Sequence, residues 1–135
     1  MPMPTYLEQL LAIGGPPLGP QLKALPKEIS VLAAPYESML EALLVNKNGF
    51  FAFESALHVF PVGPSAEGYD LGAWNSRDLW RKEYEGMADG YLFIAEDIFG
   101  EQFAIRGAQI CRFNPETGAS ESLASDPEQW AQRIL

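Results

Sequence analysis

The sequence predicts an α+β fold: one domain in which helices surround a single antiparallel sheet of about four to six strands. Three observations predict it. The 135 residues suit one domain, and 47% of them are hydrophobic, which is enough to fill a core. One stretch repeats apolar residues with helical spacing, and several short apolar stretches after residue 90 are separated by turns. We therefore treat residues 1–135 as a single domain.

Residues 1–30 are expected to form a helix followed by a connector. Thr5 and Glu8 have the spacing of a capping box, so a helix should begin after Thr5. Glycines and prolines then alternate through 14–20, which ends the helix and predicts an extended segment. The length of this connector predicts that the first helix is a loosely attached flap.

The best-defined helix is expected to begin near Pro35, a favourable first-turn residue. Its apolar residues recur three and four positions apart, as on one face of an amphipathic helix: Tyr36, Met39, Leu40, Leu43 and Leu44. The sequence Asn46–Gly49 ends it, because Gly49 can adopt a left-handed conformation.

Two short strands and a third helix are expected next. Apolar residues in Phe50–Phe53 and Leu57–Phe60 predict the strands, separated by a turn. A loop rich in proline and glycine follows, and Asn75 can cap a helix that begins there. The residues expected to anchor that helix are Trp80, Tyr84 and Met87.

The second half of the chain predicts an antiparallel meander. Tyr91–Ala95 is apolar on both faces, as in a central strand that is covered on both sides. The strands expected after it are Gln102–Ile105, Ile110–Phe113 and a weaker one at 119–124. Their short connections imply antiparallel pairing.

A last helix is predicted after Asp126, which can act as its N-cap. Pro127 suits the first helical position, and Gln129 completes a capping box. Trp130 and Ile134 are four residues apart and should anchor this helix to the core.

The order of several motifs resembles the Smi/Knr-homology (SUKH) superfamily over about residues 35–135. The matching stretches are Asn48-Gly49, Trp74-Asn75, Trp80, Tyr84, Ala95-Glu96-Asp97, Gly100, Gln102-Phe103, Glu116-Thr117-Gly118 and Trp130. The resemblance implies a SUKH-like α+β domain that is not an enzyme and binds no cofactor. Bacterial members are similar to immunity proteins that bind and neutralise toxins, many of which are nucleases. Fungal relatives act in regulation, so a regulatory or scaffold protein without a toxin partner is the alternative.

The charge and the single cysteine narrow the possible functions. A net charge of −9 with scattered basic residues argues against nucleic-acid binding. It suits a basic protein partner, although solubility alone also explains it. Cys111 is the only cysteine, so neither an internal disulfide nor a cysteine-ligated zinc site is expected. With no leader sequence and no long apolar run, we expect a cytoplasmic protein that does not enter the membrane.

The candidate partner-binding residues are acidic side chains clustered at a turn, further acidic side chains shortly before it in the sequence, and two aromatic side chains beside glycine-rich loops. They are Glu83, Glu85, Asp89, Glu96, Asp97, Glu101, Tyr69 and Trp74. Paired carboxylates can also hold a metal or transfer protons, but a solvated acidic rim is the preferred interpretation, and Asp97 suits a turn-forming role. The chain should be a monomer or a weak homodimer, because the strand at 119–124 is polar.

Two further side chains could in principle act chemically. His58 is the only histidine, so it cannot form a histidine metal cluster, and a hydrogen-bonded strand residue is the preferred interpretation. A nucleophilic Cys111 would require a base, for which His58 is the only candidate. A buried, inert cysteine is therefore the expectation, with no catalytic residue and no metal site.

Overall fold

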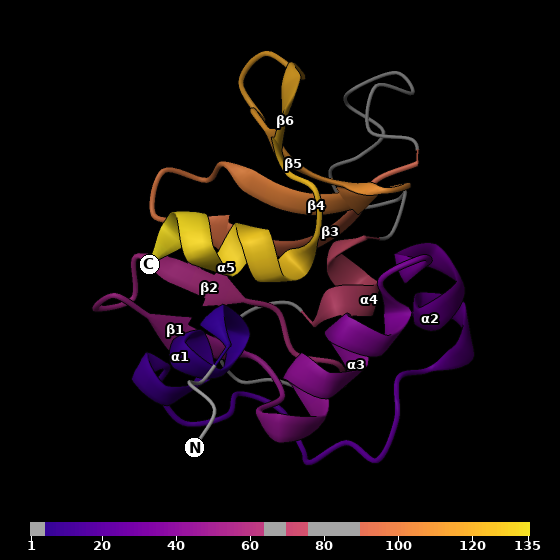
Figure 1. Ribbon diagram of the computed structural model, residues 1–135, viewed down its shortest axis with the longest axis vertical. Coiled ribbons are helices and arrows are strands. Elements are labelled where there is room, and N and C mark those ends of the chain that lie inside the picture. The colour runs from indigo at the N-terminus through magenta and orange to yellow at the C-terminus, as the bar shows by residue number, and fades with distance from the viewer. Residues whose placement is uncertain (1–4, 64–69, 76–89) are drawn as a thin grey trace.

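The computed structural model describes residues 5–63, 70–75 and 90–135. In this part of the chain, five helices accompany one six-stranded antiparallel sheet with the strand order β1-β2-β3-β4-β5-β6 (Figure 1). The helices are α1 (Tyr6–Ile13), α2 (Lys27–Ala33), α3 (Glu37–Asn46), α4 (Leu71–Trp74) and α5 (Pro127–Ile134). The strands are β1 (Phe50–Ala52), β2 (Leu57–Val59), β3 (Leu92–Asp97), β4 (Gln102–Arg106), β5 (Gln109–Phe113) and β6 (Ser120–Ala124). The predicted α+β fold with a single antiparallel sheet is confirmed.

The sheet buries both of its faces through the middle strands. One face carries Leu92, Phe103 and Ile105 into the main core, where Trp130 of α5 packs on Phe103. The opposite face, called here the second face, carries Phe93 and Phe113, whose rings meet edge to face. β3 therefore is the doubly covered central strand that its continuous apolar sequence predicts.

A bulge in β3 changes which face its last residues occupy. Phe93 pairs with Ala104 and Glu96 with Gln102, because the register shifts between Phe93 and Ala95. One extra residue in a strand reverses the alternation beyond it. Glu96 consequently shares the second face with Phe93.

The first helix is firmly attached, and the expectation of a loose flap is wrong. Thr5 caps α1 as predicted, accepting a hydrogen bond from the Glu8 amide. Leu10 is fully buried in the core. The Lys47 ammonium donates to the carbonyls of Leu11 and Gly14, so the connector is held at its start as well. Long-range contacts thus outweigh the flexibility that the connector suggests.

The helix α2 has no counterpart in the expectations from sequence. It spans seven residues, and only Ile29 and Ala33 are buried. Val31 and Leu32 are apolar yet exposed, so they obscure the helical period. α3 begins two residues after the predicted start near Pro35 and ends at Asn46, as expected.

A short helix lies just before the position predicted for the third helix. Asp70 caps α4 by accepting a hydrogen bond from the Ala73 amide, and Asn75 ends this helix. The Asn75 side chain exchanges two hydrogen bonds with the backbone of Phe93, which ties α4 to β3. The predicted helix beyond Asn75, with its anchors Trp80, Tyr84 and Met87, lies outside the described residues.

The meander and the last helix agree with the sequence patterns. The pairs β3–β4, β4–β5 and β5–β6 are all antiparallel. Asp126 caps α5 through the Gln129 amide, while the Gln129 side chain accepts from the Ser125 amide rather than from Asp126. Trp130 is fully buried, as expected for an anchor. Among the described residues, no helix is both long enough and apolar enough to span a membrane.

Candidate protein-binding surface at one end of the sheet

Three of the sheet's turns leave from the same end. In an antiparallel meander, successive connections lie alternately at the two ends of the sheet. With this strand order, the turns β1–β2, β3–β4 and β5–β6 therefore belong to one end, and the other two connections belong to the opposite end. These three turns comprise residues 53–56, 98–101 and 114–119, and we call them together the three-turn end. A small hollow of about 90 Å³ is lined by Phe99 and Glu101 from one turn and by Asn114, Pro115 and Glu116 from the next. Two of the turns therefore share a surface.

Asp97 makes the β3–β4 turn rigid. Its carboxylate oxygen Oδ1 accepts hydrogen bonds from the backbone amides of Phe99, at 2.9 Å, and Glu101, at 3.0 Å. The Gly100 amide donates to the Asp97 carbonyl, also at 3.0 Å. Asp97 is thus the turn former that sequence reasoning favoured, and its carboxylate is occupied in holding the turn.

The apolar residues held by this turn escaped the sequence reasoning. Ile98 is 68% exposed and Phe99 is 86% exposed, the largest exposure among the described large hydrophobic residues. Two apolar residues between Asp97 and Gly100 were the available signal, since turn positions of this kind are usually polar. Because they are adjacent and strongly exposed, Ile98 and Phe99 are candidates for a contact with another molecule.

Glu96 lies below this turn, against the second face of the sheet. Its carboxylate is 3.4 Å from His58 Nδ1 and accepts a hydrogen bond of 3.2 Å from the Gln102 amide group. The hydrogen bond to His58 lowers the pKa of Glu96 from its ordinary value, although burial opposes the shift. Glu96 is consequently engaged inside the protein more than it is offered to a partner.

Gln102 connects this polar group to the exposed turn. It is 2% exposed, and its amide nitrogen also donates to the Gly100 carbonyl at 2.9 Å. Its oxygen accepts from Trp74 Nε1 at 2.7 Å. Trp74, expected to be partly exposed, is half-buried on the second face and supports the turn through Gln102.

His58 is the hydrogen-bonded strand residue that was expected. It stacks on Phe51 with ring centroids 4.6 Å apart and meets the edge of Phe60. Its Nε2 is buried without a hydrogen-bond partner among the described residues. Among the described residues, the rings of Phe51 and Phe60 therefore form an apolar surrounding for the imidazole, and Glu96 is its polar contact.

Cys111 is buried, and burial raises the pKa of its thiol, which disfavours the thiolate. His58 lies on β2 and Cys111 on β5, with β3 and β4 between them. Three strand spacings amount to about 14 Å, so no Cys–His pair forms. In the part of the chain that the structure describes, no group of three or more His, Cys, Asp or Glu side chains is arranged to hold a metal ion.

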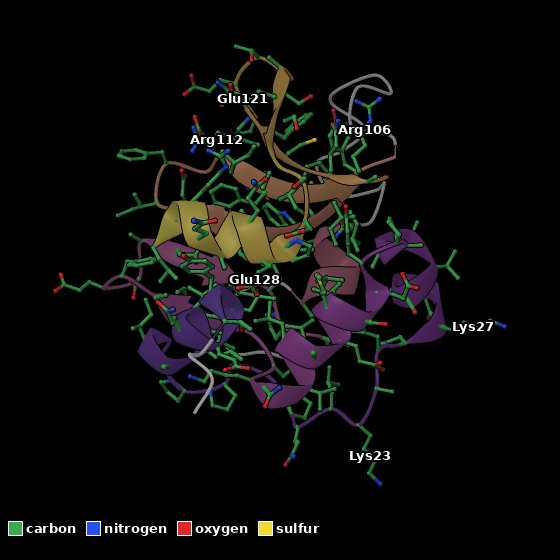
Figure 2. All side chains as sticks on the ribbon, viewed as in Figure 1. Lys23, Lys27, Arg106, Arg112, Glu121 and Glu128 are labelled. Atoms are coloured by element: carbon green, nitrogen blue, oxygen red, sulfur yellow. The ribbon has the colours of Figure 1, made fainter. Side chains whose placement is uncertain are left out.

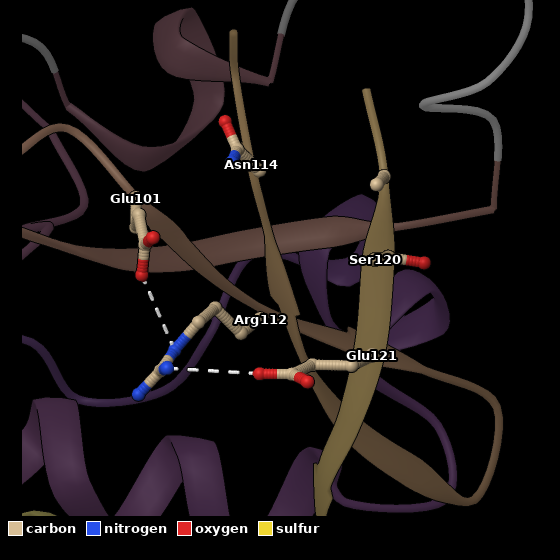
Figure 3. A pocket seen from close by; sticks show the side chains of 6 residues that line it. Glu101, Arg112, Asn114, Ser120 and Glu121 are labelled. Carbon is tan, nitrogen blue, oxygen red and sulfur yellow. Dashed lines mark ion pairs between the residues drawn. The ribbon is translucent and has the colours of Figure 1, made fainter. Parts of the chain in front are cut away.

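Glu101 and Glu121 flank Arg112 beside the three-turn end (Figure 3). The carboxylates lie 3.3 Å and 3.6 Å from the guanidinium nitrogens, and the three side chains line a shallow pocket of about 270 Å³. One cation between two carboxylates leaves the cluster with a net negative charge. Of the remaining candidates, Tyr69, Glu83, Glu85 and Asp89 lie outside the described residues.

Replacing Glu96 by glutamine is expected to make the free energy of unfolding less dependent on pH in the acid range. Because the folded-state pKa of Glu96 lies below 4.5, its contribution to stability is complete above about pH 4.5 and is lost as the pH falls through the folded-state pKa. The free energy of unfolding in urea, measured at about pH 7 and about pH 3, should therefore differ less between the two pH values in Glu96→Gln than in the unchanged protein. The exposed Glu54→Gln serves as control, and an equal pH dependence in all three proteins would contradict the assignment.

Comparisons of the chain with protein-family models, with curated proteins and with solved structures give no match. These comparisons assign the chain to no family.

Proposed function

We propose that this chain is a non-catalytic protein-binding domain that acts in the cytoplasm as an immunity protein, neutralising a toxin by direct binding. The motifs that resemble the SUKH superfamily support this proposal. The three-turn end supports it independently, because it offers apolar side chains and carboxylates, and its β3–β4 turn is held by hydrogen bonds with Asp97 and Gln102.

The charge of the three-turn end is the observation that carries the proposal. Its three turns contain Glu54, Glu101 and Glu116 and no basic residue. Lys23 and Lys27 lie on the other side of the molecule in Figure 2, away from Arg112 and Glu121. Arg112 beside these turns is already paired with the carboxylates of Glu101 and Glu121, so the acidic side chains there are in excess. An excess of carboxylates attracts and orients a positively charged partner. A nuclease toxin has a basic surface where it binds phosphate, so it suits this excess of carboxylates.

A pull-down from the native cell's extract with the tagged protein tests the proposal. The expected result is one dominant partner with a basic, toxin-like domain, whose toxicity is suppressed when both proteins are co-expressed. Signalling or cell-envelope proteins as reproducible partners would instead favour a regulatory or scaffold role. No reproducible partner, or no protection on co-expression, would count against immunity.

Reversing charge at the three-turn end is expected to slow association with the captured partner. The double variant Glu54→Lys/Glu116→Lys should lower the association rate roughly tenfold at low salt, and the difference should shrink at about 0.5 M salt. Both side chains are exposed, so the variant should fold normally.

The matched control is Glu28→Lys/Glu8→Lys, which makes the same change of net charge at exposed residues of α1 and α2. Stopped-flow or surface plasmon resonance experiments measure the association rates of both double variants. Equal slowing by the two double variants would show that net charge matters and that the position of the charge does not.

A further inference from the structure

We propose that Phe99, supported by Ile98, is the anchor of the three-turn end and inserts into an apolar recess rimmed by basic side chains on the partner protein. This inference rests on the proposed protein-binding function and adds to it the contact residue and the chemistry of the partner's site.

Phe99 is the most exposed of the described phenylalanines. Its side chain is 86% exposed, and that of its neighbour Ile98 is 68% exposed. A phenyl ring in water is unfavourable, and its transfer into an apolar recess yields a large part of the binding energy of a protein interface. Phe53, 40% exposed, lies in the β1–β2 turn, another of the three turns.

Hydrogen bonds hold the turn that carries Phe99. The amides of Phe99 and Glu101 are both bound by Asp97, and the Gly100 carbonyl is bound by Gln102. Gln102 is itself held by Trp74 and Glu96. The turn is therefore ordered before a partner arrives, so binding loses little conformational entropy in arranging it. An aromatic ring on a preorganised turn is typical of an anchor residue.

The carboxylates around Phe99 identify the partner's chemistry. Glu101, whose carboxylate is paired on one side with Arg112, shares the hollow beside Phe99 with Glu116 from the neighbouring turn. A partner that encloses the ring must approach both carboxylates closely. Acidic or neutral groups at the rim of its recess would leave them repelled or stripped of water, whereas lysine or arginine side chains would pair with them.

The same charges disfavour two other occupants. A symmetric contact between two copies of this chain would bring Glu101 and Glu116 of each copy toward their counterparts, and like charges at an interface are costly. A membrane with anionic lipids would repel the acidic turns. A basic protein is the occupant that the surface favours.

The molecule contains a matched control for this anchor. Val31 and Leu32 of α2 are also an adjacent, exposed apolar pair, at 66% and 56%. They lie beside Lys27 and Glu28, so their surroundings are balanced in charge. In Figure 1 α2 is on the opposite side of the molecule from the β1–β2 and β3–β4 turns. A substitution there tests whether any exposed apolar pair would serve.

Site-specific photo-crosslinking in the native cell is the decisive experiment. The probe is p-benzoylphenylalanine, placed at position 99 of the full chain, with the same residue at position 32 as control. We expect position 99, and not position 32, to become linked to a protein whose crosslinked peptide lies next to lysine or arginine residues. In binding measurements with that protein, Phe99→Ala should weaken the affinity at least tenfold and Leu32→Ala less than twofold.

The outcomes separate this inference from the proposed function. A toxin partner that is bound and neutralised without crosslinking at position 99, and with unchanged affinity for Phe99→Ala, overturns the anchor and leaves immunity standing. A crosslinked basic protein that is not a toxin supports the anchor and removes immunity. Crosslinking to a second copy of the chain, or to an acidic protein, overturns the partner's proposed chemistry. No protein bound in either the pull-down or the crosslinking experiment overturns both proposals.

Discussion

Changing Asn48 to aspartate is expected to lower the free energy of unfolding by about 3–5 kcal/mol, although the two side chains have nearly the same shape. Asn48 is 2% exposed. Its amide nitrogen donates to the carbonyls of Pro20, at 2.6 Å, and Val62, at 2.8 Å. Its oxygen accepts from the Val62 amide, also at 2.8 Å. Aspartate would keep the accepted bond, lose both donated bonds and place a buried negative charge against two carbonyl oxygens.

The neighbouring Asn46 provides the control for this prediction. Its side chain donates to the Ala42 carbonyl at 2.7 Å, in an exposed position at the end of α3. Asn46→Asp should therefore cost less than about 1 kcal/mol, mainly through its charge at a helix C-terminus. Urea unfolding followed by circular dichroism measures both variants. Similar losses of stability in the two variants would mean that the hydrogen bonds of Asn48 to Pro20 and Val62 do not stabilise the fold.

Asn48 also shows why part of the fold was beyond sequence reasoning. In the sequence it belongs to the stretch that ends the second predicted helix, and this local role is correct for the stretch as a whole. Its hydrogen-bond partners are 14 and 28 residues away, and no local pattern marks them. The same holds for Leu10, whose burial shows that α1 is not a flap. Contacts between distant segments decide such cases.

The meander and the last helix were predictable because their signals are local. Asp126 and Pro127 mark a helix start within a few residues, and Gly118, with a positive φ of 74°, suits the turn predicted after Asn114. The continuous apolar run of β3 requires cover on both faces wherever the strand lies in the sheet. The structure of such elements can therefore be predicted from residues that are close together in the sequence.

The candidate surface was only half predictable for a related reason. Asp97 was identified as a turn former from its residue type, but Ile98 and Phe99 have meaning only once the turn is known to point outward. Glu96 was grouped with the exposed acids, yet the bulge in β3 turns it toward His58. A bulge arises from pairing with β4, so neither residue's environment could be taken from its own neighbours in sequence.

The largest loss of stability from removing one side chain is expected at Trp130. It is fully buried, and its ring packs on Phe103 with centroids 5.8 Å apart. Trp130→Ala removes that contact and leaves a cavity between α5 and the sheet, which should cost about 3–5 kcal/mol. α1 should loosen with α5, because Glu128 of α5 accepts hydrogen bonds from the amides of Tyr6 and Leu7.

Trp130→Phe is expected to lower the free energy of unfolding far less than Trp130→Ala does, by at most about 1.5 kcal/mol. The indole Nε1 is buried without a hydrogen-bond partner among the described residues, and an unpaired buried donor is itself destabilising. Phenylalanine removes this unpaired group while keeping most of the ring, so the cavity cost and the relief oppose each other. Thermal and urea unfolding of both variants test the argument. A Trp130→Phe variant as unstable as Trp130→Ala would mean that the indole N–H has a partner, such as a bound water, and that α5 is fixed by polarity as well as by packing.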